Sequence, residues 1–204
     1  MSRKTENVKQ FTMKEEVILA SESKTRIQQI SKYIKETKVV KHLLNEDAVK
    51  ERIKDPMKLA LEIAKCKAMS LKHLYPNSFI IGSDQVLVCD QKIFNKPKNL
   101  DEAKNNLISL KNKFHFLVSS IYVLRKKKLF FKQTKKAQLF FKNIKDIDII
   151  NYVDSNPVTA MSTVGSYKIE ENDKFNFLDI ISGDMETIIG FPTNDFMKAF
   201  YNEK

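Results

Sequence analysis

One aspartate and one lysine within residues 80–98 have the types and spacing to bind a phosphate ester and its metal ion. The stretch IIGSDQVLVCDQKIFNKPK begins with an apolar run, which predicts a buried strand that ends at Gly82 and presents Asp84 beyond it. An unpaired buried carboxylate is costly, so such an acid is either capped by a neighbouring amide or placed to hold a metal ion or a proton. A short apolar piece at 92–94 predicts a hairpin that returns Lys96 to the same sheet edge. The alternative is an ordinary ion pair between two loop side chains.

A second candidate site for an anion lies near the start of the chain. A strand predicted at 16–20 is followed by SESKTR and by a helix that we expect to run to about Ile34. Ser21 and Ser23 stand at the junction, where free backbone N–H groups and the positive end of the helix dipole favour an anion. Arg26 falls in the first turn of the same helix.

The remaining pattern alternates strands and helices. We expect helices at 57–74, 101–110 and 144–154 and from Thr193 onward, and strands at 114–124, 128–132, 137–142 and 177–181. Asn99 is a candidate N-cap for the helix at 101–110. This mixed order, without internal repeats or a Pro/Ser-rich linker, predicts an α/β fold.

Composition indicates a globular protein with a proper core. The chain has 204 residues and 42% hydrophobic content, enough to bury one or two lobes. It contains no apolar run of the ~20 residues that span a bilayer, and its charged start lacks the apolar segment of a signal peptide. We therefore expect a cytoplasmic protein without a membrane partner. Cys66 and Cys89 fall in a predicted helix and strand without metal-ligand spacing, so we expect them to pack as free thiols.

The net charge of +11 is also typical of nucleic-acid-binding proteins. Four of the 36 basic residues are arginine, and the lysines are scattered, a pattern that favours compositional drift. The densest runs, 125–128 and 132–136, flank an apolar stretch at 129–131 and predict a solvated hairpin. They could attract polyanions weakly, with a steep salt dependence. We do not expect nucleic acid to be the functional partner.

Six blocks along the chain resemble the Maf nucleoside-triphosphate pyrophosphatases, and within that family the branch that acts on 7-methylguanosine triphosphate. The blocks follow one another in order as ILASESKTR (18–26), LEIAKCKA (61–68), IIGSDQVLV (80–88), NKPKNLDEAKNNLISL (95–110), VGSYKIE (164–170) and GDMETIIGFP (183–192). The resemblance implies an elongated mixed sheet flanked by helices around a central substrate cleft, as in Maf and inosine-triphosphatase proteins. It further implies one catalytic domain of two lobes at 16–204, which follows the polar tail at 1–15, and a homodimer.

The activity implied by this resemblance is hydrolysis of a nucleoside triphosphate between its α and β phosphates, with Mg²⁺, Mn²⁺ or a similar divalent cation. Asp84 matches the catalytic aspartate of the family, as general base or as metal ligand. Glu46 matches a further acid, also a metal ligand, more loosely, because Asp47 is adjacent. The positions that match phosphate-binding residues of the family are Ser21, Ser23, Arg26, Lys67 and Lys96.

Three positions match those at which branches of the family differ, namely Thr25, Gln85 and Glu170. The dTTP/UTP branch usually has Arg, Thr and Gln there, whereas the 7-methylguanosine branch has Gln after the Asp and Glu in the later loop. A carboxylate suits a methylated guanine, because it accepts hydrogen bonds from N1–H and the 2-amino group of a positively charged base. Tyr167 is the nearest aromatic residue for stacking on that base, or else a core tyrosine.

Three departures from the family pattern bear on turnover. Lys24-Thr25-Arg26 replaces Pro-Arg-Arg, Asn95 replaces a glycine before Lys-Pro, and Ser120 replaces a glycine after a strand at 114–119. We predict a pyrophosphatase that converts 7-methyl-GTP to 7-methyl-GMP and pyrophosphate. The alternatives are a dTTP/UTP pyrophosphatase of the same fold and a non-enzymatic basic protein that binds RNA or another polyanion.

Overall fold

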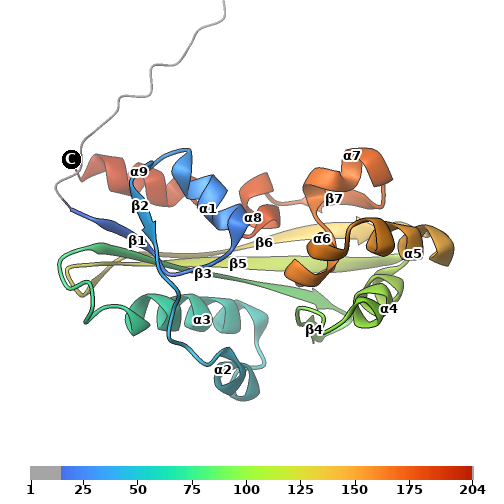
Figure 1. The fold of residues 1–204 in the computed structure, drawn as a ribbon, viewed down its shortest axis with the longest axis horizontal. Helices are drawn as coiled ribbons and strands as arrows, with labels where there is room; N and C mark the ends of the chain where they lie inside the picture. Colours follow the sequence, from blue (N-terminus) through green and yellow to red (C-terminus); the bar gives the residue numbers. More distant parts are fainter. Residues whose placement is uncertain (1–14, 204) are drawn as a thin grey trace, which may run out of the picture.

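The structure, a computed structural model, describes residues 15–203, which form one mixed sheet with helices on both faces (Figure 1). The strands are β1 (Val17–Leu19), β2 (Thr37–Val39), β3 (Phe79–Cys89), β4 (Lys92–Phe94), β5 (Lys113–Arg125), β6 (Lys128–Phe141) and β7 (Leu178–Ser182). The helices are α1 (Lys24–Ser31), α2 (Glu46–Arg52), α3 (Pro56–Ser70), α4 (Leu100–Leu110), α5 (Asp146–Ser155), α6 (Pro157–Ser162), α7 (Asn172–Phe175), α8 (Met185–Ile189) and α9 (Asn194–Asn202), with a 3-10 turn η1 (Ile169–Glu171). The predicted tail lies outside the described residues except for Glu15, which pairs with Arg125.

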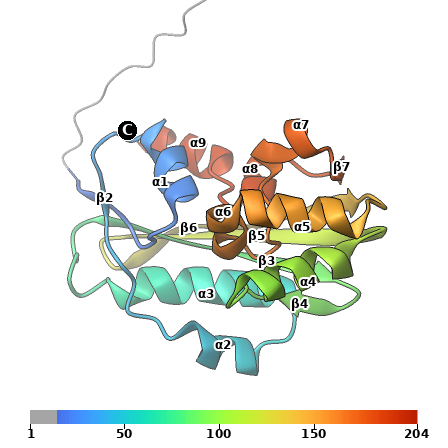
Figure 2. The ribbon, with the colours of Figure 1, turned by 45° about the vertical axis from the view of Figure 1, so that its right-hand side comes forward.

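The predicted mixed sheet flanked by helices is confirmed. Its strand order is β2-β1-β3-β5-β6-β7, with β4 added to β3. The pairs of β1 with β2 and β3 are parallel, and the other pairs are antiparallel. Helices α2 and α3 lie on one side of the sheet and α1, α8 and α9 on the other (Figures 1 and 2). Within residues 15–203, no helix has both the length and the apolar character to cross a membrane.

The prediction that a strand ends at Gly82 is wrong, because β3 continues without a break from Phe79 to Cys89. Strand β5 pairs with β3 along almost all of this length, so the backbone stays hydrogen-bonded through the polar segment. The polar side chains are tolerated inside the strand because each has a partner: Ser83 donates to a backbone carbonyl and Asp84 binds Lys67. A buried polar group that is paired no longer opposes strand formation.

The other edge of β3 is open over five residues. Strand β1 pairs with β3 as far as Ile81, and β4 begins to pair at Leu87, so no described strand pairs with residues 82–86 on this side. Side chains alternate across a strand, so Ser83 and Gln85 face the α8 side while Asp84 faces α3. This gap leaves one edge of the polar segment without a described neighbouring strand, although Ser83 and Asp84 are buried by the helices on the two faces.

Several local predictions need correction. The strands expected at 128–132 and 137–142 are one strand, β6, because its polar centre remains paired with β5. Helix α1 ends at Ser31, earlier than expected, and α3 ends at Ser70. The prediction had no strand β2 and no helices α2, α6, α7 or α8, which are too short to show a clear period. The N-cap of α4 is confirmed, since Asn99 Oδ1 accepts from the Glu102 N–H at 2.8 Å.

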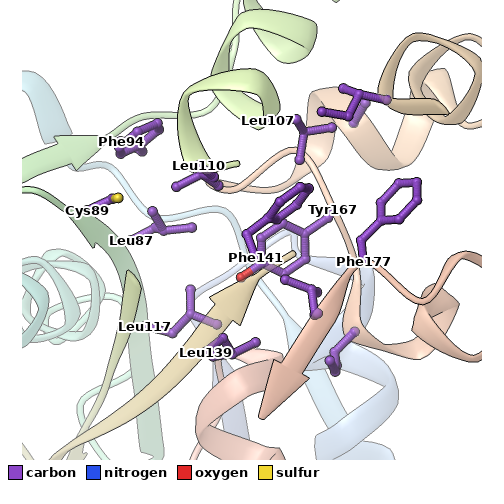
Figure 3. Close-up of a cluster of buried hydrophobic side chains, with 14 of the residues drawn as sticks. Leu87, Cys89, Phe94, Leu107, Leu110, Leu117, Leu139, Phe141, Tyr167 and Phe177 are labelled. Carbon is purple, nitrogen blue, oxygen red and sulfur yellow. The ribbon is translucent and has the colours of Figure 1, made fainter. Parts of the chain in front are cut away.

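The core consists of several clusters of buried side chains on both sides of the sheet. The largest joins β3, β5 and β6 to α4 and α5, and Figure 3 shows Tyr167 within it near Phe141 and Phe177. On the α3 side, Gly82 allows close packing of helix on sheet. A Cβ atom at this position would lie 2.0 Å from the Ala64 carbonyl oxygen. The tight contact brings α3 close to the polar segment of β3.

Candidate active site

Two carboxylates and one buried ammonium group form the centre of the site. Lys67 Nζ lies 2.8 Å from Asp84 Oδ1 and 2.8 Å from Glu46 Oε1. The lysine side chain is 6% exposed, so both contacts are made largely out of water. Three elements supply the groups: β3 carries the aspartate, α3 the lysine and the first residue of α2 the glutamate. The structure thus joins residues that are far apart in the sequence.

The start of α2 decides which of two neighbouring acids enters the site. Asn45 caps this helix, its side chain accepting from the Asp47 N–H at 3.1 Å. Glu46 then turns inward to Lys67, whereas the Asp47 side chain is 87% exposed. The structure therefore places Glu46, the assignment made more loosely from sequence, in contact with Lys67.

His42 joins this site, and sequence analysis missed it. Its Nδ1 accepts from the Leu44 N–H at 3.3 Å, so the ring donates through Nε2, which lies 3.4 Å from Glu46 Oε1. The hydrogen bond from His42, reinforced by Lys67 and opposed by burial, holds the pKa of Glu46 well below its usual range. The sequence signal was a His four residues before a Glu, but the two are not in one helix.

Two further cations approach the same carboxylates. Arg26 donates through a terminal guanidinium nitrogen to Ser83 O at 2.9 Å and through Nε to Gly190 O at 3.2 Å. Lys96 is exposed as a whole residue, but desolvation of its ammonium group, followed by repulsion from Arg26 and Lys67, lowers its pKa. The two carboxylates oppose this shift. Three cations against two acids leave an excess positive charge, which suits a polyphosphate.

The ends of the sheet gap carry the other predicted phosphate-binding residues. Ala20 N–H donates to Ile81 O, and the chain leaves β3 there to form the junction with α1. At this junction the Ser23 N–H donates to Ser21 Oγ at 3.2 Å, and Ser23 caps α1. Lys96 follows β4 at the opposite end of the gap. The structure thus distributes the predicted anion-binding groups around one opening.

A pocket beside the gap brings together all three predicted specificity residues, Thr25, Gln85 and Glu170. It contains about 370 Å³ of space, part of it open to solvent, and Lys168 and Tyr167 also line it. Thr25 directly precedes Arg26 in the sequence, and Gln85 directly follows Asp84. The pocket and the charged site are therefore neighbours.

Tyr167 is a buried residue, so the interpretation as a core tyrosine is confirmed; it also lines the pocket, and its stacking on a base stays a prediction. Its hydroxyl oxygen lies 2.6 Å from His115 Nε2, and the histidine is fully buried in β5. Gly165 leaves room for the ring, since a Cβ there would lie 2.6 Å from a Tyr167 ring carbon. The ring is thus held from its side and from its polar end.

Burial lowers the pKa of His115 to about 4, whereas an unfolded histidine titrates near 6.5. Between these values the unfolded chain takes up a proton that the folded protein does not, so stability falls as pH falls through this window. We expect the free energy of unfolding to drop by about 2 kcal/mol from this group between pH 7 and pH 5. Urea unfolding of the wild type and of His115→Gln at both pH values measures it. An equal pH dependence in the two proteins would contradict the assignment.

The lysine-rich runs lie on the hairpin of β5 and β6, as predicted, with the turn at 126–127. Lys135 in this hairpin contacts Asp184 at 3.2 Å and Asp195 at 3.0 Å. Part of its positive charge is therefore balanced within the protein. Cys66 and Cys89 are free, as expected.

Comparison with known proteins shows the family of this chain. The family model described as Maf-like protein matches residues 16–203, nearly the whole chain. The chain belongs to the Maf family. A Maf-family relative named nucleoside triphosphate pyrophosphatase, from Legionella pneumophila (strain Lens), is 28% identical over 95% of this chain and 96% of its own length. Another of that name, from Paramagnetospirillum magneticum, is 30% identical over 73% of this chain and 78% of its own.

A third relative of this Maf chain is named 7-methyl-GTP pyrophosphatase. It comes from Rhizobium etli and is 31% identical over 67% of this chain and 68% of its own length. Among solved structures, the Staphylococcus aureus Ham1 protein is similar with a TM-score of 0.48 and 14% identity, over 93% of this chain and 100% of that one.

The departures from the Maf pattern have different structural settings. Lys24 begins α1 and does not line the pocket, whereas Thr25 does. Ser120 lies in the middle of β5 and does not follow the strand, so that part of the prediction is wrong. Its hydroxyl lies 2.8 Å from Thr134 Oγ1. The serine in place of glycine is therefore accommodated by a neighbour on β6.

The two residues predicted to bind a metal ion contact a lysine in the structure. Among residues 15–203, no three or more His, Cys, Asp or Glu side chains form a metal-binding group. The two predicted ligands, Asp84 and Glu46, instead share the ammonium group of Lys67. Mg²⁺ is usually bound by one or two carboxylates together with substrate phosphates and waters. The oxygen donors present fit a cation that the substrate helps to hold.

Proposed function

We propose that this Maf-family nucleoside triphosphate pyrophosphatase acts on 7-methyl-GTP, releasing 7-methyl-GMP and pyrophosphate. The observation that supports it is the convergence on one sheet gap of a cation-rich charged site and a pocket lined by Gln85 and Glu170. A triphosphate needs the first and a base with hydrogen-bond donors needs the second.

In this proposal the cations bind and orient the triphosphate. Arg26, Lys67 and Lys96 approach from three different elements around the gap, so the phosphate chain would be held from several sides. Such fixed charges stabilise the extra negative charge that develops when an anhydride bond breaks. Desolvation and, after it, repulsion by Arg26 and Lys67 lower the pKa of Lys96, and the bound phosphates would relieve the repulsion.

Asp84 is the group placed to direct the attacking water in this proposal. One of its carboxylate oxygens, Oδ1, is engaged by Lys67, which fixes the orientation of the carboxylate. The other oxygen can accept a hydrogen bond from the water that attacks the α phosphorus, and the pyrophosphate then leaves. A divalent cation held by Asp84 and Glu46 with the substrate phosphates would supply charge neutralisation.

The pocket supports the preference for a guanine base. Glu170 is exposed to the pocket space and offers a carboxylate that accepts hydrogen bonds from the N1–H and 2-amino groups of guanine. Uracil and thymine present one N–H donor on the corresponding edge, so they would satisfy this acceptor less fully. The positive charge of a 7-methylated guanine adds an attraction to the carboxylate.

The test is a comparison of substrates with purified protein and Mg²⁺ or Mn²⁺. We expect kcat/KM to be highest for 7-methyl-GTP among 7-methyl-GTP, GTP, UTP and dTTP, with a monophosphate and pyrophosphate as the products. Release of orthophosphate in place of pyrophosphate would reject the proposed reaction. A preference for UTP or dTTP would reject the proposed substrate while leaving the reaction intact.

A further inference from the structure

Helix α8 forms one wall of the pocket, and it is too short to hold its own position. It spans Met185–Ile189, and its last two residues, Ile188 and Ile189, line the pocket. Helices of this length are unstable by themselves and depend on tertiary contacts. At its start, Asp184 accepts from the Thr187 N–H at 2.7 Å. At the other end, which faces the pocket, the Gly190 and Phe191 N–H groups donate to carbonyls of the helix.

Two polar side chains on the sheet add further support to this end. Gln85 Nε2 lies 3.1 Å from Thr187 O and 2.9 Å from Ile188 O, and Ser119 Oγ donates to Thr187 O at 2.7 Å. The final carbonyls of a helix lack partners within the helix, so these side-chain donors cap the end of α8 together with the Gly190 N–H, which also bonds to Thr187 O. The two side chains are also joined, because Gln85 Nε2 lies 3.2 Å from Ser119 Oγ.

The chemistry of the acceptors determines how Gln85 is oriented. Backbone carbonyls can only accept hydrogen bonds, so the amide must direct its NH₂ group, and not its oxygen, at Thr187 and Ile188. The two hydrogens of that group already face three acceptors. Gln85 therefore has no amide hydrogen to spare for a nucleobase, and besides lining the pocket it acts on it by holding α8.

We propose that Ser119, together with Gln85, is a positioning residue for nucleobase preference, which it sets by holding the end of α8 against the pocket. The proposal rests on the proposed function. Ser119 is fully buried in β5, directly opposite Gln85 in the strand register. Ser119 does not line the pocket and reaches it through the Thr187 carbonyl and the Gln85 amide, so its effect is on the shape of the wall next to the base.

The chain offers a matched control in the next residue. Ser120 is also fully buried, lies opposite Asp84 and has its hydroxyl 2.8 Å from Thr134 Oγ1. Because side chains alternate across a strand, its hydroxyl lies on the face of the sheet away from α8. Ser119→Ala and Ser120→Ala therefore each remove one buried hydroxyl, and only the first removes a cap from α8.

The experiment compares both variants with the wild type on 7-methyl-GTP and UTP. We expect Ser119→Ala to lower the ratio of kcat/KM for 7-methyl-GTP over UTP about tenfold, the effect of losing one hydrogen bond, mainly through KM. Ser120→Ala should leave the ratio within about twofold. An unchanged ratio in Ser119→Ala, or an equal change in both variants, would overturn the proposal.

Amide hydrogen exchange supplies a readout that needs no substrate. The Gly190 and Phe191 N–H groups bond to carbonyls of α8, so their exchange reports whether the helix end is held. We expect faster exchange at both amides in Ser119→Ala and wild-type exchange in Ser120→Ala. If Ser119→Ala folds poorly, Gln85→Met serves as the second variant, because it keeps the side-chain length without the donors. We expect faster exchange at the same two amides in Gln85→Met. Wild-type exchange in both donor variants would overturn the cap, whereas absence of turnover in the wild-type protein would reject the proposed function alone.

Discussion

Replacing Asp84 by asparagine is expected to lower kcat for 7-methyl-GTP by about a thousandfold, within the range that general acid–base groups contribute. The asparagine has the same shape and still offers an oxygen to Lys67, which also keeps its contact with Glu46. The asparagine cannot take a proton from water, and it has no negative charge with which to bind a cation. The loss should therefore fall on the chemical step and not on the fold.

Steady-state kinetics with pyrophosphate detection, together with thermal unfolding of the same samples, measure this effect. Asp47→Asn is the control, because this neighbouring acid is 87% exposed and pairs only with Lys50 among the contacts described. It should retain wild-type kcat. Turnover of Asp84→Asn within tenfold of the wild type would show that the catalytic group lies elsewhere.

Glu170→Gln is expected to reduce kcat/KM for 7-methyl-GTP at least about tenfold, because hydrogen bonds to a charged acceptor are worth about 1.5–3 kcal/mol. The glutamine also loses the attraction to the positive charge of the methylated base. Activity on UTP should change much less, so the preference shifts toward the pyrimidine. Kinetics on both nucleotides measure the shift.

The adjacent residue provides the control for that variant. Glu171 is turned away from the pocket: its carboxylate accepts from Tyr152 Oη at 2.6 Å and from Thr159 Oγ1 at 2.9 Å. Glu171→Gln should lower the free energy of unfolding by about 1–2 kcal/mol and leave the nucleotide preference unchanged. If it altered preference as strongly as Glu170→Gln, the carboxylate of Glu170 would not be the base-recognising group.

The site shows where sequence reasoning works and where it stops. Asp84 and Lys96 could be named in advance because an acid inside an apolar strand and a lysine after a short apolar piece are visible in the sequence, and Lys67 because its block resembles the family. The structure brings these three together, with Arg26 and Glu46. Their roles in catalysis stay predictions. His42 was missed because its link to Glu46 crosses a helix start that the sequence does not reveal.

The sequence by itself determined the alternation of strands and helices, the positions of the charged side chains and the resemblance to one family. Tertiary structure decided that β3 continues through its polar segment, because β5 supplies hydrogen bonds along almost the whole strand. It also decided the position of α8, whose five residues show no clear period and whose end is held by Gln85 and Ser119. Local patterns reflect the nearest neighbours in the chain, whereas a strand register and a side-chain cap depend on partners tens of residues away.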